Sequence, residues 1–77
     1  MSEMVIKGEV KMMYRNLKAE QARHNLTNQQ MAEILHLSRG GFENKLRNGK
    51  FFVNECVVLC RLFDCKFDYL FATDNPA

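Results

Sequence analysis

Polar and basic side chains are concentrated in residues 38–50, at a spacing typical of one face of a helix. An arginine guanidinium can donate two parallel hydrogen bonds to the edge of guanine, and an asparagine amide can pair in the same way with adenine. Arg39 and Asn44 are the side chains in this segment that suit these two roles. This chemistry requires a helix that holds both side chains on one exposed face.

The opposite face of the same helix is predicted to pack inward. Phe42 and Leu46 are four residues apart, which places them on one side of a helix. Ser38 can cap the first turn, and the Asn48-Gly49 pair can end the helix because glycine readily adopts the left-handed conformation. The outer face would then carry Arg39, Gly40, Glu43, Asn44, Lys45, Arg47 and Asn48.

A shorter helix is predicted directly before this one. The Thr27 hydroxyl can cap its first turn while the side chain of Gln30 reaches back to the Thr27 backbone. Small Ala32 would let another helix approach closely, and His36 and Leu37 would form the turn. The apolar residues of this helix fall at helical spacing: Met31, Ile34 and Leu35.

Three more helices are predicted around this pair. The first runs from about Glu9 or Val10 to Arg23, and Asn25 can stop it in the left-handed conformation. Its inner positions would be Met13, Leu17 and Ala22.

The other two helices follow the polar segment. One spans residues 53–63, ends at Asp64, and would place Val53, Cys56, Val57, Cys60 and Phe63 on one side with Leu59 beside them. The last is a short turn at residues 68–71, and it would insert Phe67, Leu70 and Phe71 into the core. Five helices and no strand predict an all-α fold.

Composition bounds the class of protein. A chain of 77 residues with 47% hydrophobic and 26% charged residues is long enough for one small globular domain. The net charge of +2 is only weakly basic, yet the cations gather in and just after the polar helix, as a nucleic-acid-facing patch requires. The N-terminus lacks a continuous apolar run and no segment approaches the roughly 20 apolar residues of a membrane span, so we expect a cytoplasmic protein without a signal peptide.

The three cysteines fit a core better than a metal site. Structural zinc normally takes four ligands, often from CxxC pairs, and the chain has no such pair. Cys56 and Cys60 are instead expected to act as small buried apolar residues. No phosphate loop, nucleophile motif or carboxylate pair is present, so we expect no enzyme, no cofactor, no metal and no small-molecule substrate.

Taken in order, the segments resemble the helix-turn-helix family of phage lambda repressor and Cro, also called the XRE family. TNQQMAEILHLS is similar to the second helix and turn of the family, RGGFENKLRNGK to its recognition helix, and VNECVVLCRLFDCKFDYLF to its last two helices. The resemblance covers residues 14–72 and implies a five-helix lambda-repressor-like fold with the helix-turn-helix at helices two and three. We divide the chain into an N-terminal arm or helix extension (residues 1–11), a DNA-binding domain (12–72) and a tail (73–77).

The chain departs from the family pattern at three places. His36 occupies a left-handed turn position where the family usually has Gly, at a cost on the order of 1 kcal/mol. Phe52 stands where the family usually caps its fourth helix with Thr or Ser. Gly40 and Gly41 lie near the start of the recognition helix, and Gly40 has no side chain with which to touch a base.

The resemblance implies a sequence-specific double-stranded DNA-binding regulator, of the small phage or prophage repressor type, that reads the major groove with residues 38–48. The expected base contacts are Arg39, Gly40, Asn44 and Lys45. The expected phosphate contacts are Thr27, Asn28, Gln29, Ser38, Arg47, Asn48 and Lys50. The alternative is a protein-binding module of the same fold, such as an antitoxin, anti-repressor or adaptor, and the double glycine and weak net charge favour it slightly.

A homodimer on a DNA operator is expected, because one short helix reads few bases. Two surfaces could support it: the aromatic C-terminal region around Phe67, Tyr69 and Phe71, or the N-terminal arm of residues 1–11.

Overall fold

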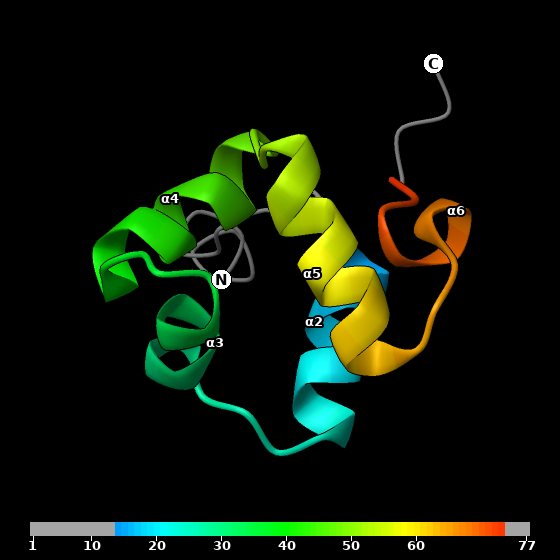
Figure 1. Cartoon of the computed structure of the whole chain (residues 1–77), viewed down its shortest axis with the longest axis horizontal. Coiled ribbons are helices and arrows are strands. Elements are labelled where there is room, and N and C mark those ends of the chain that lie inside the picture. Colours follow the sequence, from blue (N-terminus) through cyan, green and yellow to red (C-terminus); the bar gives the residue numbers. More distant parts are fainter. Residues whose placement is uncertain (1–13, 74–77) are drawn as a thin grey trace, which may run out of the picture.

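The computed structural model describes residues 14–73, which form five helices and no strand (Figure 1). The helices are α2 (Arg15–Arg23), α3 (Asn28–Ile34), α4 (Arg39–Asn48), α5 (Val53–Phe63) and α6 (Phe67–Leu70). The predicted all-α fold is therefore confirmed over this range. None of these helices is both long enough and apolar enough to cross a membrane.

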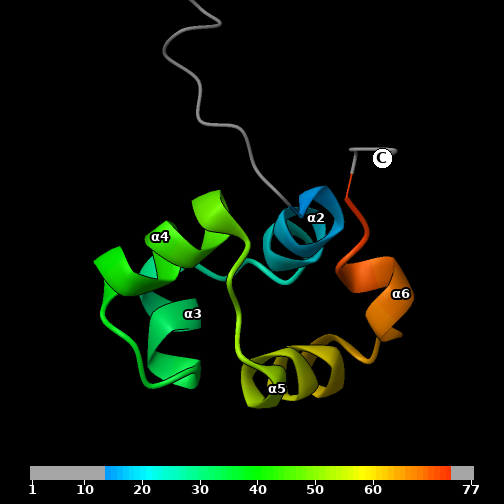
Figure 2. The ribbon, with the colours of Figure 1, turned by 90° about the horizontal axis from the view of Figure 1, so that it is seen from above.

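The helices are arranged around one core. α3 packs closely against α4, while α6 contacts both α2 and α5. Seen from above, the α3–α4 pair lies on one side of the molecule and α6 on the other, with α2 and α5 between them (Figure 2). The buried apolar side chains come from all five helices and their ends: Leu17, Met31, Ala32, Leu35, Phe42, Leu46, Leu59, Phe63, Leu70 and Phe71.

Three of the helices end in the same kind of left-handed turn. Asn25, His36 and Asp64 follow α2, α3 and α5 with φ angles of 56°, 60° and 52°. In each turn the next amide donates back to a carbonyl of the last helical turn, as Leu37 N does to Ala32 O at 2.8 Å. The stops predicted at Asn25 and Asp64, and the left-handed backbone expected at His36, are confirmed.

The first described helix differs from its prediction in rotation, and it does not continue back through Tyr14. Tyr14 has φ −121° and ψ 89°, which is not helical, so the helix begins at Arg15. Ala22 was expected to face inward, but it is exposed, whereas Glu20 and Gln21 are buried. The rotation is tolerated because both buried polar side chains find hydrogen-bond partners on other elements.

The prediction for the inner face of α5 is also partly wrong. Val53 and Val57 are 80% and 43% exposed, and the buried line runs instead through Glu55, Leu59 and Phe63. The apolar stripe alone could not reveal this, because α5 carries apolar residues on two sides. A carboxylate takes one core-facing position because cationic and amide donors satisfy it there.

Some predictions concern residues outside the described range. They are the start of the first helix at Glu9 or Val10, the inward position of Met13, the arm of residues 1–11, and the tail beyond Thr73.

Candidate nucleic-acid interface

Helix α4 is fixed in rotation by its buried side and in length by its two ends. Phe42 and Leu46 are fully or nearly fully buried, as predicted. The Ser38 hydroxyl accepts a hydrogen bond from Gly41 N at 3.0 Å, and Gly49 closes the helix with φ 74°. The predicted cap and stop are confirmed, and the exposed face of α4 is thereby determined.

Helix α3 begins with the reciprocal cap expected from the sequence. Gln30 N donates to Thr27 Oγ1 at 3.0 Å, and Thr27 N donates to Gln30 Oε1 at 2.8 Å. Two amides that would otherwise lack partners are satisfied in this way. Thr27 is therefore a capping residue, whatever else it contacts.

A shared carboxylate ties α3 to the start of α4. Asn28 Nδ2 and Arg39 Nε both donate to Glu43 Oε2, each at 2.9 Å. The two donors hold the pKa of the Glu43 carboxyl below its usual range, with the Asn28 hydrogen bond the larger cause and the Arg39 hydrogen bond next. Glu43 therefore stays ionised next to the Arg39 guanidinium.

Asn28 is in turn anchored by helix α2. Lys18 Nζ and Gln21 Nε2 donate to Asn28 Oδ1 at 3.0 and 2.9 Å, and Gln21 is only 4% exposed. Burial lowers the pKa of Lys18, while the charge of Glu43 acts in the opposite direction. Side chains from three helices thus form one connected polar chain that ends at Arg39. Only the Arg39–Glu43 link, four residues apart on α4, had a signal in the sequence spacing; the links from α2 through Asn28 to Glu43 had none, because those residues lie on separate elements.

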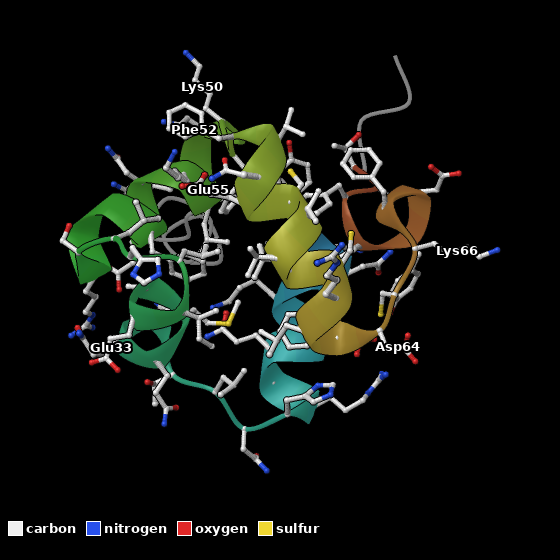
Figure 3. The ribbon with its side chains drawn as sticks, viewed as in Figure 1. Glu33, Lys50, Phe52, Glu55, Asp64 and Lys66 are labelled. Carbon is white, nitrogen blue, oxygen red and sulfur yellow. The ribbon has the colours of Figure 1, made fainter. Side chains whose placement is uncertain are left out.

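Lys45 lies at the junction of α4 and α5 rather than on the outer face. Its ammonium is 3.2 Å from Glu55 Oε1, donates to Lys50 O at 3.2 Å, and lies 3.9 Å from the ring centre of Phe52. Its side chain is only 15% exposed, so the predicted outer placement is wrong. The cause is the buried Glu55 carboxylate, which also accepts from Phe52 N at 2.8 Å. Figure 3 shows Phe52 and Glu55 at this junction, with Lys50 extending away from it.

The remaining polar residues of α4 are exposed and close together. Arg47 donates to Asn44 Oδ1 at 2.8 Å, and Lys50 N donates to Asn48 Oδ1 at 2.8 Å. These two contacts use the Asn44 amide oxygen and the Lys50 backbone amide, and neither uses the Asn44 NH₂ group or the Lys50 ammonium. On α3, Gln29 pairs with the exposed Glu33 at 3.2 Å.

Most of the predicted contact residues lie on the exposed surface formed by α3, α4 and their connecting turns. The exposed ones are Thr27, Gln29, Ser38, Arg39, Gly40, Asn44, Arg47, Asn48 and Lys50. Asn28 and Lys45 are half-buried and bonded within the protein. Apart from its chain neighbours and the backbone of its own helix, no atom of residues 14–73 lies within 4 Å of the place that a Cβ would take on Gly40, so the described structure leaves α4 open there. We call this surface the α3–α4 face.

A second feature is an apolar groove of about 680 Å³ between the start of α2, α5 and α6, and Phe67 and Phe71, from the C-terminal region considered as a dimer surface, are among its lining residues. It is lined by Tyr14, Phe51, Val53, Cys56, Val57, Cys60, Arg61, Phe67, Phe71 and Thr73. Phe67 was expected in the core, but it is 56% exposed at this groove. The sequence signal was present in the apolar stripe of α5, which was assigned to the core instead.

The cysteines are reduced and half-buried. Cys56 and Cys60 pack against the core from the groove side, in partial agreement with the core prediction. Burial raises the pKa of each of the three thiols, which keeps them protonated near neutral pH. Within residues 14–73, no three His, Cys, Asp or Glu side chains come together as a possible metal site.

Comparisons of the chain with models of protein families, with curated proteins and with solved structures found no match.

Proposed function

We propose that this protein is a sequence-specific double-stranded DNA-binding regulator, with a lambda-repressor-like helix-turn-helix formed by α3 and α4. One observation carries the proposal: two capped helices joined by a tight turn, with the second presenting Arg39 and Asn44 on a face that buried Phe42 and Leu46 hold outward. In helix-turn-helix proteins the second helix enters the major groove and the first crosses the backbone.

The roles of individual residues follow from this placement. Arg39 would read guanine and the amide NH₂ of Asn44 would donate to a base acceptor. Gln29, Arg47 and Lys50 are exposed at the edges of the α3–α4 face, where phosphates would lie. The remaining expected phosphate contacts would act through backbone and capping groups: Thr27, Asn28, Ser38 and Asn48.

Two expected base contacts take smaller roles in this proposal. Gly40 would allow close backbone approach to the DNA, since it has open space in place of a side chain. Lys45 would support the α4–α5 junction, because its ammonium already contacts Glu55 and Lys50. The base-reading set would then be small, which favours binding as a homodimer to two half-sites of an operator. Occupying an operator would let a phage- or prophage-type repressor exclude the polymerase.

The apolar groove favours a second candidate, a protein-binding module of the same fold such as an antitoxin, anti-repressor or adaptor. The groove offers exposed Val53, Val57 and Phe67 to another polypeptide. In addition, Arg39 and Lys45 are each paired with a carboxylate of the same chain. This candidate predicts weak binding to DNA or none.

Selection of bound duplexes from a random pool, followed by titration at several salt concentrations, separates the two candidates. DNA binding predicts an enriched motif and a log–log salt slope that becomes shallower by about 0.9 for each phosphate contact removed. Arg47→Ala should reduce the slope, whereas Lys66→Ala, an exposed cation at the far end of the molecule, should leave it unchanged (Figure 3). No enrichment and no salt-dependent binding would overturn the DNA-binding proposal.

A further inference from the structure

The geometry of the Arg39 guanidinium points to a function for the neighbouring carboxylate. Glu43 Oε2 accepts from Nε of Arg39 at 2.9 Å, and this is the nitrogen nearest the aliphatic stem. The two terminal Nη groups, which form the fork that pairs with guanine, take no part in that hydrogen bond. The Arg39 side chain is 65% exposed, so the fork remains open to a partner.

The carboxylate that holds Arg39 is itself held in place. Asn28 Nδ2 donates to the same oxygen, and Asn28 is fixed by Lys18 and by the buried Gln21. Glu43 is consequently tied to a rigid part of the fold rather than free to follow the arginine. A functional side chain held by such a supporting layer loses less conformational entropy when it binds.

We propose that Glu43 is a positioning residue that aims Arg39 at guanine, and that the polar chain from Gln21 and Asn28 fixes this aim. The inference rests on the proposed DNA-binding function and names its base specificity: one guanine in each half-site, read by Arg39 through the support of Glu43. Glu43 itself makes no base contact in this arrangement.

A positioning role and a purely electrostatic role predict effects of different kind. A carboxylate on a DNA-facing surface repels phosphate, so removing it should strengthen binding to random DNA about two- to fivefold, the size typical of one exposed charge interaction. Loss of positioning should instead weaken the preference for guanine, because an unrestrained arginine pairs less selectively. If Glu43 is a positioning residue, removing it should therefore raise the affinity for random DNA and lower the preference for guanine. If it acts only through its charge, removing it should raise the affinity and leave the preference unchanged.

The test measures the affinity of each variant for the selected duplex, for the same duplex with the guanine pair replaced, and for random duplex. Glu43→Ala should reduce the guanine preference about tenfold, within the range that one bidentate pair supplies. Glu43→Gln should keep most of the preference, because its amide oxygen can still accept from Arg39 Nε. In an Arg39→Ala background, Glu43→Ala should have no further effect on the preference.

Glu33→Gln is the matched control. Glu33 is on α3 (Figure 3), and its carboxylate accepts a hydrogen bond from Gln29. Glu33→Gln therefore removes one negative charge, as Glu43→Gln does, without removing the carboxylate that contacts Arg39. Glu33→Gln should strengthen binding to random DNA without changing the preference for guanine. In the free protein, the Hε proton of Arg39 should exchange more slowly in wild type and Glu43→Gln than in Glu43→Ala, which reports the contact without DNA.

The outcomes are distinguishable. If wild type binds no duplex at all, the proposed function fails, and this inference fails with it. If wild type shows an Arg39-dependent guanine preference that Glu43→Ala retains in full, only the positioning role is overturned. A preference that does not depend on Arg39 also overturns it, while leaving DNA binding intact.

Discussion

At the scale of single residues, the most consequential groups are two carboxylates that each join a partner near their own position to a partner on another helix. Glu43 accepts from Asn28 and Arg39, and Glu55 contacts Lys45 and the Phe52 amide. Each satisfied carboxylate fixes a neighbouring cation: Arg39 on the exposed face, and Lys45 at the α4–α5 junction. Two cations on one helix therefore have different surroundings: the Arg39 side chain is 65% exposed and the Lys45 side chain 15% exposed, each beside its own carboxylate.

The lowered pKa of Glu43 gives a testable dependence of stability on pH. Because the folded-state pKa lies below its usual value, the ionised carboxylate stabilises the fold above the ordinary pKa of 4.5, and this contribution is lost as pH falls through the folded value. Glu43→Gln should therefore be less stable than wild type at pH 7, and the difference should shrink below about pH 4.5. Thermal melts of both proteins between pH 7 and pH 2.5 would measure it.

Asn28→Ala is the companion variant, since it removes the largest cause of the shift while leaving Glu43 in place. It should bring the carboxyl pKa, followed by NMR titration, closer to its usual range. If the difference in stability between wild type and Glu43→Gln stayed constant with pH, the ionised Glu43 carboxylate would not be the source of that difference.

At the scale of elements, local signals were sufficient for helix ends and insufficient for helix rotation. The caps at Thr27 and Ser38 and the stops at Asn25, Gly49 and Asp64 depend on residues within one turn, so the sequence predicted them. These ends, together with buried Phe42 and Leu46, are the part of the candidate site that was predictable.

Rotation depends on which polar groups find partners across the fold. Glu20, Gln21 and Glu55 are buried because other elements supply partners for them, and which element comes within reach depends on how the helices pack. The same reason explains why the chain of side chains leading to Glu43 could not be predicted. An apolar stripe is likewise ambiguous when it borders a groove, as Val53 and Val57 show.

The turn between α3 and α4 allows a direct test at this scale. His36 has φ 60°, and its exposed imidazole makes no hydrogen bond to any residue between 14 and 73. His36→Gly should stabilise the fold by up to about 1 kcal/mol, because glycine removes the left-handed strain, partly offset by its larger entropy in the unfolded chain. Denaturant unfolding would measure the change.

His36→Ala is the control for the side chain, because alanine keeps the strain while removing the imidazole. It should be no more stable than wild type. A clear loss of stability in His36→Gly would show that the ring contributes a stabilising contact and would contradict the strain argument.

At the scale of the whole molecule, two surfaces differ in chemistry. The α3–α4 face presents arginine, amide and hydroxyl groups, whereas the groove between α2, α5 and α6 is apolar. In Figure 2 the α3–α4 pair and α6 lie on different sides of the molecule. Contact between copies at the groove would consequently leave the α3–α4 face available, as a DNA-binding dimer requires.

A substitution in the groove tests whether this surface joins two copies on DNA. Val57 lines the groove and is 43% exposed, so Val57→Lys should disrupt an apolar interface without disturbing the core. We expect the molar mass from light scattering to fall to that of a monomer. Affinity for an operator with two half-sites about 34–36 Å apart should fall at least tenfold, since two separate monomers would then bind the half-sites independently.

Leu62→Lys is the matched control, because Leu62 lies on the same helix, is 38% exposed and does not line the groove. Dimerisation through the groove would be contradicted if Val57→Lys and Leu62→Lys changed the molar mass and the operator affinity equally. It would also be contradicted if wild type were a monomer and bound the operator as tightly as Val57→Lys does.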